Sequence, residues 1–126
     1  MKHADSPEKL HQLFVQALNA RDLDALTSLY SDDACLSPAA GDTACGLSQV
    51  RTLLASYCAM KPVIQLTTRN IIAAGDTALL MSDWRMTAIA PDGSAVESAG
   101  TSVEVARRQA DGSWRYLIDL PYGIGD

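Results

Sequence analysis

The sequence contains few of the residues from which metal sites and cofactor sites are built. Its 126 residues include only two histidines, His3 and His11, and three cysteines that form no Cys-x-x-Cys pair. A zinc site is therefore not expected, and we interpret Cys35, Cys45 and Cys58 as small buried apolar residues. The sequence has no glycine-rich phosphate-binding motif either, so we predict neither a metal nor a cofactor.

Positive charge and long apolar segments are also scarce. The formal net charge is -5, and Arg107 and Arg108 form the only adjacent pair of basic residues. A nucleic acid or an anionic membrane surface is thus not expected as a partner. No apolar run approaches the roughly 18 residues that a membrane-spanning helix needs. Because residues 1–5 are mostly polar as well, we predict a cytoplasmic location.

The remaining composition is typical of one globular domain. Hydrophobic residues make up 48% of the chain, and a chain of this length can bury a core without disulfides or metals. No low-complexity linker and no internal repeat divides it. We therefore expect residues 1–126 to form a single domain.

Helical patterns occupy the first half of the chain. Ser6 is a typical N-cap with Pro7 at the first helical position, and Asp22 can cap a second helix. A third helix is expected after Gly46, and it should end before Pro62. In all three segments apolar residues recur at helical spacing, which predicts helices with one buried face.

Turn signals recur at regular intervals after Val63, at residues 75–76, 91–93 and 111–112. They predict four antiparallel strands joined by hairpins. Helices followed by strands are the pattern of an α+β fold. If each hairpin closes through a two-residue loop, the register is fixed and each side chain can be assigned to one face of the sheet.

This register gathers charged side chains on one face. It places Glu104 directly opposite Asp119 and Asp83 opposite Ser102, with Arg85 two residues further along. Opposed residues on antiparallel strands have Cβ atoms about 4.5–5.5 Å apart. Three carboxyls and one guanidinium are therefore expected in a small area.

Two interpretations of this face remain open. An antiparallel sheet commonly exposes its polar face to water, in which case these charges are only solvated. The same face also carries many apolar side chains, which suits a pocket with an apolar end and a polar end. The apolar residues are Leu66, Ile72, Leu79, Met81, Ala106 and Leu117.

A covered face would give the carboxyls a chemical use. Two adjacent buried acids cannot both ionise at low cost, so one should keep its proton. Such a pair can serve as general acid and general base. Because the two groups would titrate as a unit, which one is the acid stays open.

Three motifs resemble a known superfamily. The segment VQALNARDLDALTSLYSDDA at residues 15–34, the third helix with four strands after it, and ADGSWR at residues 110–115 are similar to the nuclear-transport-factor-two-like superfamily. The segment RRQADGSWRYLIDLPYG, residues 107–123, looks most like the SnoaL-like, ketosteroid-isomerase-like subgroup. The resemblance covers nearly the whole chain, and its motifs specify architecture better than chemistry.

The resemblance implies a cystatin-like cone, in which three N-terminal helices pack on a curved, mostly antiparallel sheet around a central cavity. The mixed face should then line the cavity. Members of the superfamily often form homodimers through the outer face of the sheet. By resemblance, the residues of that interface are Trp84, Val103, Val105, Tyr116 and Ile118.

Two relatives in the superfamily suggest different chemistry. Ketosteroid isomerase is a poor match, because its oxyanion-hole tyrosine falls at Phe14, its general base falls near Ser37, and only Glu104 keeps a carboxyl. Limonene epoxide hydrolase is similar in having an Arg-x-Asp pair on the strand of Asp83 and Arg85, here in swapped order. That enzyme also has an aspartate at the position of Asp119.

These considerations define the predicted site. The predicted catalytic residues are Asp83, Arg85, Glu104 and Asp119. The predicted ligand contacts are Phe14, Leu18, Tyr30, Tyr57, Leu66, Met81 and Leu117. We expect a cavity for a small, mostly apolar organic molecule and cofactor-free acid–base chemistry, either hydrolysis, dehydration or isomerisation. The alternative is a non-catalytic ligand-binding or dimeric assembly module of the same fold.

Overall fold

The structure is a computed structural model that describes residues 2–39 and 41–123. Its helices are α1 (Pro7–Asn19), α2 (Leu23–Thr27) and α3 (Leu47–Ala59), which confirms the three predicted helices. Ser6 precedes α1, with Pro7 at its first position. The Asp22 side chain caps α2 by accepting a hydrogen bond from the Ala25 amide at 3.1 Å.

Six strands form one sheet. They are β1 (Tyr30–Leu36), β2 (Ala44–Cys45), β3 (Val63–Ala74), β4 (Thr77–Ile89), β5 (Ala95–Arg108) and β6 (Trp114–Leu120). The order across the sheet is β2-β1-β6-β5-β4-β3. The last four strands are the predicted antiparallel meander, whereas β1 joins its edge in parallel to β6. The fold is therefore α+β with a mostly antiparallel sheet, as expected.

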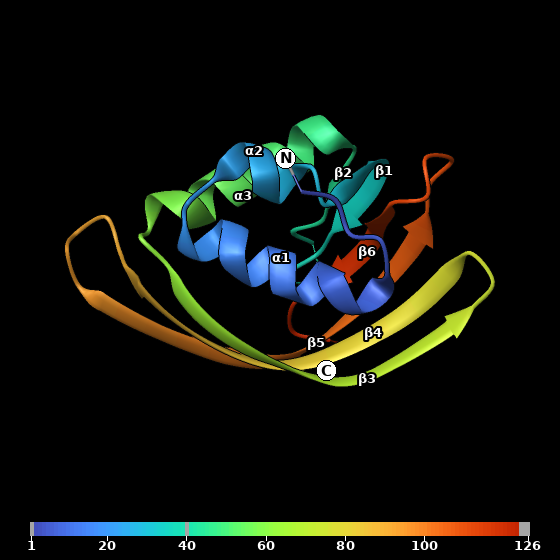
Figure 1. Cartoon of the computed structure of the whole chain (residues 1–126). Coiled ribbons are helices and arrows are strands. Elements are labelled where there is room, and N and C mark those ends of the chain that lie inside the picture. The colour runs from blue at the N-terminus through green and yellow to red at the C-terminus, as the bar shows by residue number, and fades with distance from the viewer. Residues whose placement is uncertain (1, 40, 124–126) are drawn as a thin grey trace.

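The long strands curve around the helices. Figure 1 shows β3, β4 and β5 bending beneath α1, with the helices on the concave side of the sheet. The core lies between these layers and includes Leu10, Leu26, Leu54 and Leu80, each at most 1% exposed. None of the described helices is both long and apolar enough to cross a membrane.

The predicted register of β4 against β5 was wrong by one residue. Their hairpin closes at the pair Ile89–Ala95, and residues 90–94 form a loop longer than the two residues assumed. Gly93 takes a positive φ of 86° there, and Ala90 donates a backbone hydrogen bond to Ser94 at 2.9 Å. A shift of one residue exchanges the two faces of a strand. Every side chain of β4 thus points to the face opposite the one predicted.

The β5–β6 hairpin has the same longer loop but keeps the predicted pairing at its far end. The strands first pair at Arg108–Trp114, whereas a two-residue loop at residues 111–112 would have paired Ala110 with Ser113. A bulge at Leu117 then lies between the pairs Ala106–Tyr116 and Val105–Ile118. An extra residue in one strand shifts the register by one. The bulge therefore cancels the loop error for residues beyond it, and turns Tyr116 to the cavity face.

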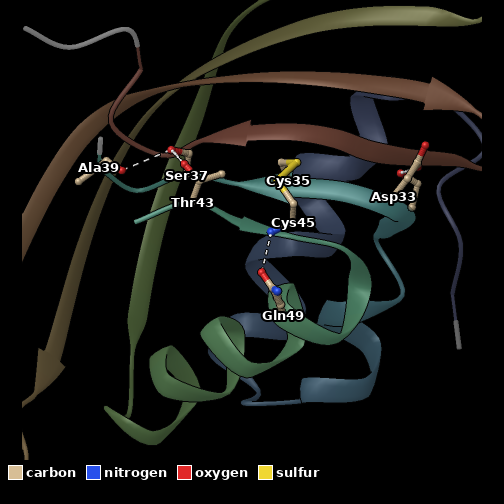
Figure 2. The surroundings of a disulfide bond; sticks show 8 residues. Asp33, Cys35, Ser37, Ala39, Thr43, Cys45 and Gln49 are labelled. Atoms are coloured by element: carbon tan, nitrogen blue, oxygen red, sulfur yellow. Dashed lines mark hydrogen bonds between the residues drawn. A yellow bond between two sulfur atoms is a disulfide. The ribbon is translucent and has the colours of Figure 1, made fainter. Parts of the chain in front are cut away.

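The prediction that all three cysteines are isolated apolar residues was also wrong. Cys35 on β1 and Cys45 on β2 lie opposite one another and form a disulfide, while Cys58 is free. Figure 2 shows the bond beside the start of α3, where the Gln49 side chain accepts a hydrogen bond from the Cys45 amide. The bond ties the edge strand β2 to β1. It was missed because the two-residue strand β2 has no pattern that predicts a hairpin with β1.

Replacing Cys35 and Cys45 together by serine should lower the free energy of unfolding by about 2–3 kcal/mol, because a short covalent loop is opened. The two cysteines are 10 residues apart. Urea unfolding of the double variant and of the wild type measures this difference. Cys58→Ser, which removes only the free thiol, is the control. Equal unfolding midpoints for the double variant and the oxidised wild type would contradict a stabilising disulfide.

Candidate active site

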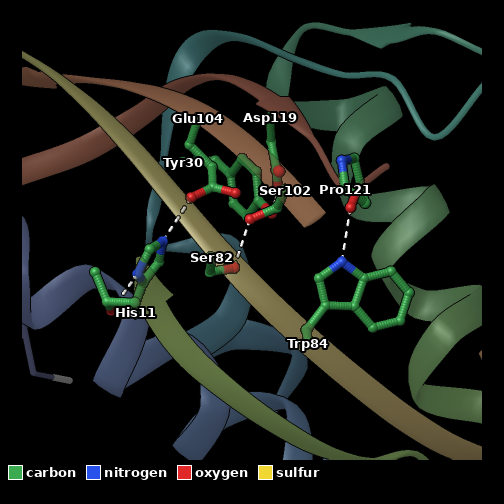
Figure 3. A network of polar contacts seen from close by, with 9 residues as sticks. His11, Tyr30, Ser82, Trp84, Ser102, Glu104, Asp119 and Pro121 are labelled. Atoms are coloured by element: carbon green, nitrogen blue, oxygen red, sulfur yellow. Dashed lines mark hydrogen bonds and ion pairs between the residues drawn. The ribbon is translucent and has the colours of Figure 1, made fainter. Parts of the chain in front are cut away.

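Two carboxyls lie at the polar end of a cavity between the helices and the sheet. Glu104 on β5 and Asp119 on β6 are direct partners across the two strands, and only 4% and 6% of their surfaces are exposed. Both side chains line the cavity (Figure 3). The predicted neighbour relation is confirmed, and the interpretation as a solvated face is excluded for this pair.

Tyr30, the first residue of β1, holds Asp119 from the neighbouring strand. Its hydroxyl donates a hydrogen bond of 2.6 Å to Asp119 Oδ2. Burial first, and then the negative charge of Glu104, raise the pKa of Asp119 to about 8, although the Tyr30 hydrogen bond acts in the opposite direction. Burial and the nearby acid also raise the pKa of Tyr30 well above 10. At neutral pH Asp119 is therefore a neutral acid, and Tyr30 is a donor to it.

His11 on α1 is a site residue that the sequence analysis missed. Its ring is 3% exposed, with Nε2 at 2.5 Å from Glu104 Oε1 and Nδ1 at 2.7 Å from Thr68 Oγ1 on β3. Figure 3 shows the ring between the sheet and α1, directed at Glu104. The sequence did contain a signal, since His11 precedes Phe14 and Leu18 at the spacing of one helical face.

Tyr116 contributes a further aromatic hydroxyl group to the cavity. The bulge in β6 brings it to this face, where its ring centroid is 5.2 Å from that of Tyr30 and 6.3 Å from that of Phe14. Burial, followed by the charges of Glu104 and Asp119, raises its pKa well above 10. Tyr116 is thus a neutral hydroxyl at neutral pH. Its predicted place on the outer face was wrong, because the bulge was not foreseen.

The rest of the cavity lining is mostly apolar and includes several aromatic rings. The indole of Trp84 on β4 donates a hydrogen bond of 2.6 Å to the Pro121 carbonyl, and its ring packs 5.3 Å from that of Tyr122. The segment after β6 therefore crosses the cavity beside Trp84. Burial, followed by the charge of Asp119, raises the pKa of Tyr57 on α3 to about 12. The other apolar lining residues are Phe14, Leu18, Leu36, Leu54, Ile64, Leu66 and Met86.

The cavity is small. Its volume is about 100 Å³, and an apolar cavity of about 150 Å³ can hold a benzene molecule. Among its described lining residues there is no lysine or arginine. In the described part of the chain no cluster of three or more His, Cys, Asp or Glu side chains could hold a metal ion. The arrangement thus offers acid, base and hydroxyl groups to a compact ligand.

The predicted site residues divide into two groups. Those that the structure brings to the cavity are Glu104, Asp119, Phe14, Leu18, Tyr30, Tyr57 and Leu66. Those that it does not bring there are Asp83, Arg85, Met81 and Leu117. The one-residue shift of β4 sends Asp83, Arg85 and Met81 to the outer face, and Leu117 lies at the bulge.

The outer-face contacts of Asp83 confirm this separation. Its carboxylate accepts a hydrogen bond of 2.8 Å from Thr101 and lies 3.5 Å from Arg69. Arg85 is exposed on the same face. These charges are surface groups, and the expected Asp-Arg-Asp arrangement around one ligand does not form.

The fold has many relatives among solved structures. A ketosteroid isomerase-like protein from Erwinia carotovora atroseptica shares 20% identity at a TM-score of 0.80, over 90% of this chain and 89% of that chain. A nuclear transport factor 2-like superfamily protein from Salmonella enterica serovar Typhimurium shares 18% identity at a TM-score of 0.79, over 89% of this chain and 84% of that chain. An uncharacterised protein with a cystatin-like fold from Caulobacter vibrioides shares 17% identity at a TM-score of 0.78, over 92% of this chain and 85% of that chain.

At these identities the similarity establishes the fold and not an activity. No curated protein matches the sequence. The SnoaL-like domain family matches residues 11–117, a range that contains His11, Tyr30, Glu104 and Tyr116. The chain therefore belongs to the SnoaL-like domain family.

Proposed function

We propose that this protein binds a small, mostly apolar organic molecule in its cavity and catalyses an acid–base reaction on it without a cofactor. One observation carries the proposal: Asp119, a neutral acid at neutral pH, lies opposite Glu104, and both are buried in a mostly apolar cavity. Catalysis of proton transfer needs one group that donates and another that accepts under the same conditions. This pair meets that requirement.

The contacts of each carboxyl indicate which oxygen is free to react. Tyr30 occupies Oδ2 of Asp119, which leaves Oδ1 to carry the proton. His11 occupies Oε1 of Glu104, which leaves Oε2 to accept one. Glu104 would take a proton from the ligand while Asp119 gives its own to a ligand oxygen. In dehydration a proton passed from Glu104 to the ionised Asp119 then restores the starting state, whereas in isomerisation Glu104 returns its proton to the ligand and Asp119 recovers its own from the ligand oxygen, so both acids end as they began.

Isomerisation and dehydration both fit this exchange. In isomerisation the proton removed from one carbon returns at another, with the ligand oxygen held by Asp119. In dehydration the proton from Asp119 leaves with the hydroxyl group as water. Hydrolysis requires in addition a water molecule next to Glu104. The cavity volume of about 100 Å³ restricts the ligand to a compact molecule with one oxygen function.

The catalytic proposal is tested by screening small cyclic ketones, alcohols and epoxides for binding by ligand-observed NMR and then for turnover. In Glu104→Gln and Asp119→Asn, turnover of a hit should fall at least about 100-fold while the ligand still binds, because each variant removes one proton-transfer group. Asp83→Asn, on the outer face, is the control. Hits that bind and are never converted would favour the non-catalytic binding module.

The pH dependence of stability provides a test that needs no ligand. Asp119 has a pKa of about 8 in the folded protein and an ordinary value of about 4 in the unfolded chain. Between these pH values the folded protein holds a proton that the unfolded chain releases. The contribution of Asp119 to stability is therefore full below pH 4 and is lost as the pH rises to about 8.

The variant Asp119→Asn should lack this loss, because an amide does not titrate. Urea unfolding at pH 5, 7 and 9 should show that the stability of the variant relative to the wild type increases with pH. Asp83→Asn, which replaces an exposed carboxylate, is the matched control. Parallel pH profiles for Asp119→Asn and the wild type would show that Asp119 is not a buried neutral acid.

We further propose that two copies associate through the outer face of the sheet. Trp84 and Tyr116, expected in this interface, line the cavity instead, but Val103, Val105 and Ile118 do lie on the outer face. The cross-strand pairs align an apolar surface over four strands. Its residues are Ile72, Leu79, Met81, Val103, Val105, Ile118 and Leu120. A contiguous apolar surface of this kind is typical of a contact between proteins.

The variant Ile118→Lys should separate the dimer, because it places a charge on the β6 part of this surface, where 41% of the isoleucine is exposed. Light scattering coupled to gel filtration should find about twice the chain mass of 13.4 kDa for the wild type and a single mass for the variant. Ile89→Lys changes an equally exposed isoleucine at the far end of β4 and serves as control. A monomeric wild type would overturn this proposal.

A further inference from the structure

His11 is a buried, polar group whose two ring nitrogens both have partners. Nδ1 lies 2.7 Å from Thr68 Oγ1 and Nε2 lies 2.5 Å from Glu104 Oε1. The ring belongs to α1, whereas its partners belong to β3 and β5. An apolar residue at this helical position would be enough to fill the space. The contact with Glu104 therefore points to a role in the acid pair rather than in packing alone.

The groups around the pair define what His11 can change. The titratable groups that line the cavity are His11 on α1, Tyr30 on β1, Tyr57 on α3, Glu104 on β5, Tyr116 and Asp119 on β6, and Tyr122 after it. The lining residues from β3 and β4 are not titratable. His11 is thus the one described lining side chain that can carry a positive charge.

The two carboxyls consequently have unequal donors. Asp119 receives its hydrogen bond from a neutral phenol, and Glu104 contacts an imidazole that can be charged. A donor that carries charge stabilises a carboxylate more strongly than a neutral donor does. Because the strands place the two acids side by side, the better-stabilised one ionises first and keeps the other protonated.

We propose that His11 is a positioning residue that makes Glu104 the proton acceptor and Asp119 the proton donor of the pair. The Nε2–H group of His11 donates to Glu104 Oε1, and Thr68 completes the contact at Nδ1. A neutral ring does this when the Thr68 hydroxyl donates to Nδ1, and a charged ring does it when Thr68 accepts. The purpose of this assignment rests on the proposed acid–base function, but the location of the protons can be measured without a substrate.

The experiment is a carbon-13 NMR titration of the side-chain carboxyls, together with nitrogen-15 detection of the His11 ring. Glu104→Gln and Asp119→Asn assign the two signals. In the wild type at pH 7, Nε2 should carry a proton, Glu104 should be ionised and Asp119 should be protonated. A wild-type ring with a bare Nε2 would overturn the proposal, because Glu104 would then have to donate to it.

The variant His11→Phe keeps a ring in place but removes the donor. Glu104 should then hold the proton at pH 7, because Tyr30 still donates to Asp119. The midpoint of the Asp119 titration should fall by about one pH unit or more, since a neutral Glu104 no longer opposes its ionisation. If Asp119 remains the later of the two to ionise, His11 does not assign the roles.

Two further variants separate this role from a structural one. His11→Gln offers only a neutral amide N–H to Glu104, comparable to the phenol that Asp119 has, and an oxygen to Thr68, so the pH midpoint of its Glu104 titration should lie above that of the wild type, also if His11→Phe does not fold. His3→Phe alters the other, exposed histidine and should change nothing. A His11→Gln protein in which both acids titrate as in the wild type would overturn the proposal, because a donor that can carry charge would then not be what separates them.

The outcome is independent of whether the protein proves to be an enzyme. A reversed order in His11→Phe with no turnover of any compound would leave the assignment standing and contradict the catalytic proposal. Once a substrate is known, His11→Phe should lower kcat at pH 7 by at least about tenfold with a smaller effect on KM. A kcat equal to that of the wild type would count against His11 and not against the acid pair.

Discussion

The burial of two neighbouring carboxyls is the constraint on which the other features of the cavity depend. Glu104 and Asp119 are opposite one another on adjacent strands, where water cannot screen them. Two negative charges in that position would strongly disfavour folding, so one group stays neutral and each has its own hydrogen-bond partner. Helix α1 supplies the partner of Glu104, and the first residue of β1 supplies the donor to Asp119. The packing that forms the core therefore also positions the hydrogen-bond partners of the two acids.

The strand patterns in the sequence predicted the four long strands well. They paired β5 correctly with the next strand only where two register errors, from the loop and from the bulge, cancelled. Turn residues located all three hairpins, because glycine with positive φ is required at each turn. Loop length was not visible in the same way, since Asp-Gly fits both a two-residue loop and a longer one. In β4 the resulting error of one residue persisted along the strand, so the prediction assigned Asp83 and Trp84 to the wrong faces of the sheet. In β6 the bulge compensated for it, so the pairing of Glu104 with Asp119 was correct although the assumed loop was not.

Features that depend on contacts between distant segments were not predictable in this way. The Cys35–Cys45 bond requires that β2 pair with β1, and two residues are too few for a strand pattern. The contact of His11 with Glu104 joins residues 93 positions apart. Helical periodicity could have placed His11 on the face of Phe14 and Leu18, but not named its partner. Sequence periodicity thus predicts which side chains share one face of a helix or strand. It does not predict which residues of different elements come into contact, and the chemistry of this site depends on those contacts.

The acid pair also restricts which ligands the cavity favours. An anionic ligand would place a second negative charge beside Glu104, and the described lining has no lysine or arginine to offset it. A ligand with only donor groups would leave the proton of Asp119 without an acceptor, and an unpaired buried polar group costs about 1–3 kcal/mol. The combination best suited to the site is an uncharged molecule with an acceptor oxygen near Asp119 and an apolar body among Phe14, Tyr57 and Trp84. Under the proposed function, binding such a molecule would stabilise the protonated form of Asp119, so the ligand itself would strengthen the proposed division of roles between the two acids.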